Sequence, residues 1–188
     1  FSFMLINKGD QLISHPSILG DFSFGRSVIL ITHSGRRDGY LGFVLNRRLD
    51  IDLIDLIPEV NVSIPIYEGG PVENESLYFI HTVDELADTS LQVADGLYWG
   101  GDIEQMKDWM RTSYNSKQYI RFFMGYSGWE FGQLEQEIED EVWVLDKSHI
   151  SFHNIFEKKE ELMWKDKINQ IGGKLTYWQN APENPDYN

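Results

Sequence analysis

Two glycine-rich segments most constrain what this chain can fold into: "YEGGPV" at residues 67–72 and "GYSGWEFG" at residues 125–132. Each directly follows an apolar run typical of a β-strand. Glycine adopts positive φ angles and lets two backbones approach closely, so each segment predicts a sharp corner. Such a corner presses the main chain either against another strand or against a ligand, and its exposed amides can bind an anion. The sequence alone leaves these alternatives open.

Short apolar runs predict that most of the first half of the chain is β-structure. The predicted strands are residues 5–14, 28–33, 40–47, 62–68 and 77–82, followed later by 119–124 and 142–146. Several runs, such as "SVILI" and "LYFI", are continuously apolar instead of alternating. Continuous runs indicate strands that are covered on both faces.

Fewer segments have helical spacing. A helix is predicted over residues 103–114, because Asp102 can cap it and apolar residues then recur every three or four positions. A second helix carries Trp164 and should end at Gly172, and residues 52–58 form a shorter piece. This order of elements predicts an α+β fold. We expect one domain over residues 1–175, and a loosely ordered, Pro- and Asn-rich tail over residues 176–188.

Composition excludes several classes of protein. Thirty acidic residues against sixteen basic ones give a net charge of −14, which repels nucleic acid and anionic membrane surfaces. No cysteine is present and no apolar run reaches the ~20 residues that span a bilayer, so we expect a soluble cytoplasmic protein. His149 and His153 are four residues apart, but no third ligand accompanies them. We therefore expect no metal and no cofactor.

The glutamates of the second glycine segment resemble a catalytic pair. If a helix begins near Gly132, Glu135 and Glu137 point about 200° apart at 100° per residue, so they cannot share one substrate. Glu135 falls near the third helical position, where a carboxylate accepts hydrogen bonds from free amides. We interpret Glu135 as a capping residue, with a ligand-facing role as the alternative.

Four other polar residues are candidates for chemistry. Ser127 lacks the G-x-S-x-G spacing of a hydrolase nucleophile, so it is interpreted as a turn hydroxyl. His81 ends an apolar strand and is either a base in a pocket or a histidine whose hydrogen bonds are satisfied within the fold. Asn46 and Arg47, at the exit of "GFVLNR", are equally suited to binding a carboxylate or to fixing a loop.

The combination of motifs is more specific than any one of them. "RSVILITH" at 26–33, "GYLGFVLNR" at 39–47, "YEGGPV", and "GYSGWEFGQLEQEI" at 125–138 occur in the order typical of the YqgE/AlgH family, which the chain therefore resembles. Departures are Arg48, where that family often has proline, and Glu130-Phe131, where it often has a pair such as Gly-Pro.

The resemblance implies a bacterial, cytoplasmic, single-domain protein with a bifurcated, barrel-like β-sheet wrapped by helices. Some members of that family are labelled transcriptional regulators, but this chain has no helix-turn-helix pattern and is acidic, so we expect no direct DNA binding. The resemblance supplies no established catalytic residue.

Together these observations predict a noncatalytic, regulatory protein that binds a small molecule or a protein partner. The candidate binding residues are Asn46, Arg47, Gly69, Gly70, His81, Ser127, Trp129 and Glu135. The alternative is a hydrolase or transferase for a small polar substrate, in which His81, Ser127 or Glu135 acts and Arg47 binds an anion. That alternative requires at least two of these side chains to converge in one cleft.

Overall fold

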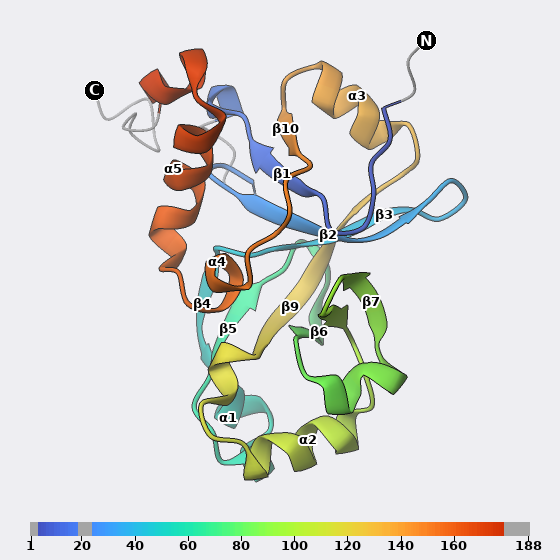
Figure 1. The fold of residues 1–188 in the computed structure, drawn as a ribbon, viewed down its shortest axis with the longest axis vertical. Coiled ribbons are helices and arrows are strands. Elements are labelled where there is room, and N and C mark those ends of the chain that lie inside the picture. The colour runs from blue at the N-terminus through green and yellow to red at the C-terminus, as the bar shows by residue number, and fades with distance from the viewer. Residues whose placement is uncertain (1–3, 19–23, 179–188) are drawn as a thin grey trace.

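A computed structural model describes residues 4–18 and 24–178. In this part of the chain, ten strands form one sheet and five α-helices pack around it (Figure 1). The strands are β1 (Gln11–Ser14), β2 (Val28–Gly35), β3 (Gly39–Val44), β4 (Arg48–Asp52), β5 (Pro65–Glu68), β6 (Val72–His81), β7 (Leu91–Ala94), β8 (Leu97–Trp99), β9 (Ile120–Trp129) and β10 (Trp143–Asp146). The helices are α1 (Leu53–Leu56), α2 (Ile103–Thr112), α3 (Gln133–Glu139), α4 (Phe152–Phe156) and α5 (Glu160–Ile171).

The sheet forks at β9. The main path runs β10-β1-β2-β3-β9-β6-β8-β7, and β4 and β5 lie off it. Residues 122–124 of β9 pair in parallel with β5, and residues 127–129 pair antiparallel with β3. The opposite edge of β9 pairs with β6. One long strand therefore belongs to two branches, which separate at Gly125 and Tyr126.

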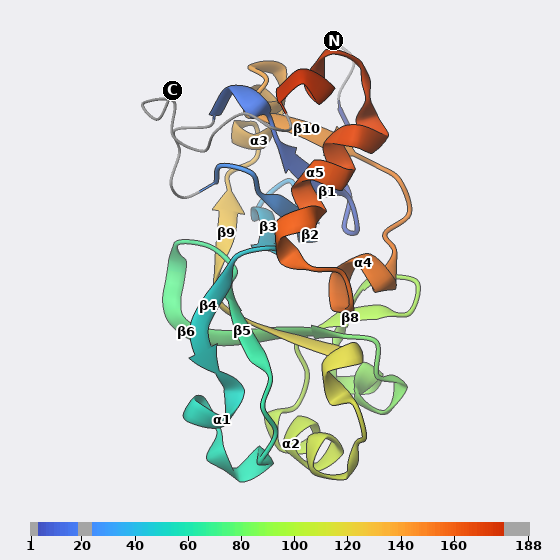
Figure 2. The same ribbon diagram turned by 90° about the vertical axis from the view of Figure 1, so that its left-hand side faces the viewer.

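The branch that contains β1, β2 and β3 is covered on both faces, as the apolar runs predict. Alternate residues of β2 belong to different core clusters: Val28 and Leu30 pack with Trp164 of α5, whereas Ile29 and Ile31 pack with Leu134 of α3. This is the two-residue period of a strand buried on both sides. Figure 2 shows α5 lying along this branch.

Helices α1 and α2 cover the second branch, at the opposite end of the long axis (Figure 1). Met106 and Met110 of α2 are fully buried against Phe79 of β6 and Phe122 of β9. The predicted cap forms, because the Asp102 carboxylate accepts a hydrogen bond from the amide of Gln105.

The two glycine segments meet where the branches separate. A β-carbon added to Gly69 would lie 2.3 Å from the Gly125 carbonyl oxygen, and one added to Gly70 would lie 2.2 Å from the Tyr126 carbonyl. Gly125 has φ +71°, and its added β-carbon would lie 2.4 Å from the Gly70 oxygen. These separations are shorter than any contact that a side chain tolerates. The glycines are therefore needed for packing of backbone against backbone, which we call the glycine junction (Gly69, Gly70, Gly125).

The structure corrects several predictions. "GYSGW" is not a turn: residues 125–129 continue β9, and the bend before α3 comes at Gly132, which has φ +93°. Strands β4, β7 and β8 were not predicted, because they are short and partly polar. Within the described residues the edge strands β7 and β10 do not pair, so the sheet is open and a barrel is not confirmed. Of the predicted tail, residues 179–188 lie outside the described residues.

The glycine junction predicts a sharp contrast between two glycines of one strand. We expect Gly125→Ala to lower the free energy of unfolding by at least about 3 kcal/mol, because it adds both a backbone clash and an unfavourable positive φ. Gly128→Ala is the control, since its nearest new contact would be at 3.6 Å and its φ is not positive. Urea denaturation measures both. Equal losses in the two variants would contradict the role assigned to the junction.

Candidate functional site

The predicted site residues Asn46 and Arg47 fix a loop. The Asn46 side chain accepts a hydrogen bond from the amide of Val28 at 3.0 Å and donates one to the carbonyl of Arg26 at 2.8 Å. The Arg47 guanidinium donates to the carbonyl of Gly25 at 3.4 Å. Both side chains thus hold the segment that enters β2, which is the second of the two roles considered for them.

His81 is fully buried, and both of its ring nitrogens have partners. Nδ1 accepts a hydrogen bond from the amide of Val83, so Nε2 carries the proton and lies 2.7 Å from the Ser90 hydroxyl and 3.1 Å from the Gly100 carbonyl. Burial lowers the pKa of the imidazole, which keeps the ring neutral. In this arrangement neither nitrogen has a free lone pair with which to take a proton from a substrate.

Ser127 lies beside the glycine junction and bonds one of its residues. Its hydroxyl is buried and donates a hydrogen bond to the carbonyl of Gly69 at 3.0 Å. Gly69 and Gly70 therefore let their own backbone come close to the backbone of β9. The backbone of β9 fills the space in which a ligand would lie against these glycines.

Glu135 caps α3, as predicted. Its carboxylate accepts a hydrogen bond from the amide of Gly132 at 2.7 Å and another from the hydroxyl of Tyr40. Burial and the neighbouring carboxylate both raise the pKa of the Tyr40 hydroxyl above its usual value. Tyr40 lies on β3, so this bond joins α3 to the sheet.

Glu137 and Trp129 form a second attachment of α3 to the sheet. One oxygen of the Glu137 carboxylate accepts from the indole nitrogens of both Trp129 and Trp143, at 2.9 and 2.8 Å. The two indoles lie edge to face. Glu135 and Glu137 thus bond different side chains, although Tyr40 and Trp129 are paired across β3 and β9, and Trp129 is buried in the core.

His81, Ser127 and Glu135 thus each form hydrogen bonds with a different part of the fold. Arg47 holds the loop that precedes β2. The described residues do not show these side chains converging in one cleft, which the enzyme hypothesis requires.

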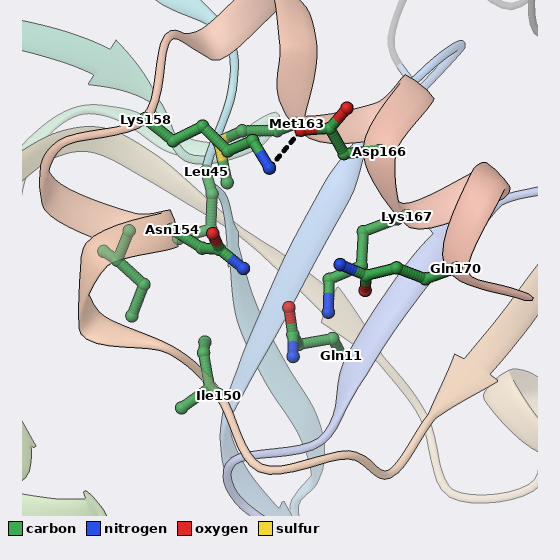
Figure 3. Close-up of a pocket in the computed structure, with 10 residues that line it drawn as sticks. Gln11, Leu45, Ile150, Asn154, Lys158, Met163, Asp166, Lys167 and Gln170 are labelled. Atoms are coloured by element: carbon green, nitrogen blue, oxygen red, sulfur yellow. Dashed lines mark ion pairs between the residues drawn. The ribbon is translucent and has the colours of Figure 1, made fainter.

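A different group of residues surrounds a pocket between β1, α4 and α5 (Figure 3). Its cavity volume is about 10 Å³, which is room for about one water molecule. Its lining residues are Gln11, Leu45, Ile150, Asn154, Ile155, Lys158, Met163, Asp166, Lys167 and Gln170. Gln11 is only 2% exposed, and its Nε2 atom has no hydrogen-bond partner among the described residues.

An unpaired buried amide is unusual, because its desolvation costs about 1–3 kcal/mol. Gln11 lies on the same face of β1 as Ile13, which packs against α5. Figure 3 shows the oxygen of the Gln11 amide turned toward the space between Asn154 and Gln170, and its nitrogen turned the other way. Gln11 therefore lines the pocket, and its nitrogen is a buried donor without a partner within the described residues.

The charges of the pocket are already paired. Lys167 bonds Asp146 of β10 at 2.8 Å, and both side chains are largely buried. Lys167 and the hydroxyl and amide of Ser148 lower the pKa of Asp146 despite its burial. Lys158 forms a second ion pair with Asp166 across the mouth of the pocket (Figure 3).

None of these pocket residues was among the predicted site residues, although a signal for them exists. Glutamine at position 11 shares the core-facing side of β1 with Ile13, which marks it as a buried polar residue. Four lining residues lie on one face of α5, because successive ones are three, one and three positions apart: Met163, Asp166, Lys167 and Gln170. No helical or strand pattern, however, indicates that these two faces meet.

Fold and site together define an α+β protein with a forked ten-stranded sheet and a small pocket at one helix-covered face. The model of the AlgH-like family matches residues 11–176. The chain belongs to this family, known as YqgE/AlgH, as its motifs indicated. Within the described residues, no helix has both the length and the apolar character needed to cross a bilayer.

Individual relatives agree with this assignment. A UPF0301 protein of Bacteroides thetaiotaomicron is 35% identical over 98% of this chain and 93% of its own length. The UPF0301 protein CT0663 of Chlorobaculum tepidum is 32% identical over 99% of this chain and 98% of its own.

Two solved structures have the same fold. Protein DIP2367 of Corynebacterium diphtheriae has a TM-score of 0.77 at 23% identity, covering 96% of this chain and 95% of that one. The AlgH protein of Pseudomonas aeruginosa has a TM-score of 0.70 at 22% identity, covering 93% and 94%.

The bond between Tyr40 and Glu135 predicts a dependence of stability on alkaline pH. Above pH 10, the tyrosine ionises in the unfolded chain but stays protonated in the folded one, so its contribution to the free energy of unfolding is lost as pH rises. We expect Tyr40→Phe to be less stable than the natural protein by about 1–3 kcal/mol at pH 8, and this difference to shrink above pH 10. Urea denaturation from pH 7 to pH 11 measures it. A difference that stays constant with pH would contradict the raised pKa.

Proposed function

We propose that this protein is a noncatalytic, cytoplasmic regulatory protein that binds a small ligand or a protein partner at the surface around the pocket between β1, α4 and α5. The observation that carries the proposal is Gln11, which lines the pocket and whose buried amide nitrogen lacks a partner within the described residues. Folded proteins rarely leave a buried donor unpaired, and such groups are found where a ligand or ordered water completes the bonding.

The hydrogen bonds of the other candidate residues also support a noncatalytic role. His81, Ser127 and Glu135 use their polar atoms to hold backbone, a helix end or a neighbouring strand. A hydrolase or transferase would need a nucleophile and a base within hydrogen-bond reach of each other. The geometry of these three side chains does not favour that chemistry.

Charge supports the absence of direct DNA binding. The net charge of −14 opposes association with a phosphate backbone, and the two lysines of the pocket already pair with aspartates. A regulatory effect on transcription, if this protein has one, would act through a ligand or a protein partner.

Replacement of Gln11 tests the ligand role through an unusual combination of effects. We expect Gln11→Met to keep or raise the free energy of unfolding by about 1 kcal/mol, a shift in Tm of about 2–4 °C, because it removes an unpaired buried donor while preserving shape. The same variant should lose the thermal shift that a bound metabolite produces in the natural protein. Thermal denaturation against a panel of small polar metabolites measures both effects.

Gln136→Met is the matched control, because Gln136 is an exposed glutamine on α3 whose amide bonds only Asp140 among the described residues. It should retain every ligand response. A clear loss of stability in Gln11→Met would instead identify Gln11 as a structural residue and would contradict the proposed function.

A further inference from the structure

Arg121 is a buried cation in the sheet. It interrupts the apolar run of β9, and only 6% of the residue is exposed. Its Nη1 atom donates a hydrogen bond to the carbonyl of Leu45 at 3.0 Å, and its guanidinium lies 4.1 Å from the centroid of the Tyr67 ring. Burial lowers the pKa of Arg121, but a guanidinium keeps its proton in proteins. The interior therefore holds a positive charge that needs compensation.

One hydrogen-bonding edge of Arg121, formed by Nε and Nη2, has no partner in the part of the chain that the structure describes. No carboxylate there forms an ion pair with Arg121, and the side chain has no hydrogen bond besides that to Leu45. Glu160, the first residue of α5, acts on Arg121 electrostatically but pairs with Arg48 instead, at 3.8 Å. Nε and Nη2 donate side by side, in the spacing that matches the two oxygens of a carboxylate. The bond to Leu45 leaves this whole edge available.

Tyr67 adds a second donor beside this edge. It is the register partner of Phe123, two residues after Arg121, so the side chains of Tyr67 and Arg121 project from the same face of the sheet. Tyr67 is only 4% exposed, and its hydroxyl forms no hydrogen bond with any described residue. Burial raises the pKa of this hydroxyl, which therefore stays protonated and can donate. Neither the Tyr67 oxygen nor the Nε and Nη2 atoms of Arg121 belong to the unpaired atoms that are shut off from solvent, so both donors still contact solvent.

The surrounding charges favour a ligand with one negative charge. Arg48 lies opposite Tyr67 in the β4–β5 pair, and its charge is balanced by Glu160. Glu161 also acts on Tyr67, but it is exposed, so solvent screens it. Because Arg121 forms no ion pair within the described residues, a single carboxylate neutralises it. A doubly charged anion would meet stronger repulsion from Glu160 and Glu161.

We propose that Arg121 and Tyr67 bind the carboxylate of a small monoanionic molecule. The two carboxylate oxygens accept hydrogen bonds from Nε and Nη2 of Arg121, and one of them also accepts from the Tyr67 hydroxyl. Because the fold already holds the guanidinium and the hydroxyl in place, the ligand gains charge-assisted bonds without further ordering of these side chains. This site needs no ligand or partner at Gln11, so it is independent of the function proposed above.

Acetate is the probe for this site, and acetamide is its uncharged counterpart of nearly equal shape. Titration of the ¹⁵N-labelled protein at constant ionic strength, followed through the Nε–H resonance of Arg121, reports binding at the guanidinium itself. We expect acetate to shift this resonance saturably, and acetamide and chloride to leave it in place. Inorganic phosphate at pH 7.5, where most of it is doubly charged, should bind more weakly than acetate.

The variant Tyr67→Phe separates a role in binding from a role in folding. It removes a hydroxyl that no described residue uses, so its Tm should stay within about 2 °C of that of the natural protein. The half-saturating concentration of acetate should nevertheless rise about tenfold, because one hydrogen bond to the charged ligand is lost. Glu160→Gln should lower that concentration, since it removes a neighbouring negative charge. Tyr114→Phe is the matched control, because Tyr114 is 88% exposed, and it should change neither quantity.

Several results would overturn the carboxylate site. If acetate shifts the Arg121 resonance no more than chloride does, Arg121 binds no carboxylate. If phosphate binds more tightly than acetate, the assignment of a monoanionic carboxylate is wrong. If Tyr67→Phe binds acetate as tightly as the natural protein, Tyr67 has no part in the site, and a large loss of Tm in that variant would show that the hydroxyl stabilises the fold instead. None of these results bears on Gln11, so the carboxylate site and the proposed function can fail separately.

Discussion

Contact of backbone with backbone at the glycine junction is the constraint on which the rest of this structure depends. Gly69 and Gly125 bring the end of β5 and the middle of β9 so close that no side chain fits between them. This contact lets one edge of β9 pair with β5 over residues 122–124 and with β3 over residues 127–129. The Ser127 hydroxyl then closes the junction with a hydrogen bond to Gly69. Without the close contact at the glycine junction, the two helix-covered branches would not share a strand.

The sequence predicted those parts of the fold that follow from local pattern. The continuous apolar run of β2, the capped start of α2 and the end of α5 at Gly172 each follow from spacing along the chain, and all three are present. The glycine segments were recognised as sites of close approach, but the sequence could not identify what approaches them. That answer depends on contacts between residues about 55 positions apart. For the same reason the prediction of a turn at "GYSGW" is wrong, since glycine permits both a bend and a tightly packed strand.

The candidate site differs from the predicted one for a related reason. Residue type draws attention to His81, Ser127 and Glu135, yet their partners are supplied by neighbouring strands and loops, and these partners are invisible in the sequence. Gln11 is the opposite case: an unremarkable residue type for which tertiary structure supplies no partner for one donor within the described residues. Which polar group is left over after folding is a property of the whole arrangement. It is also a better indication of a binding site than residue type alone.

The pairing of β1 with β10 joins residues 11–14 to residues 143–146, and the pairing of β3 with β9 joins residues 40–42 to residues 127–129. During synthesis, therefore, β1 and β3 must wait for the later strands β10 and β9 before these edges are covered. A topology so rich in distant contacts folds slowly, since long loops must close before the contacts that stabilise them can form. Until β9 and β10 leave the ribosome, the apolar residues of β1 to β3 lack much of their cover, and this exposed surface favours aggregation of the nascent chain.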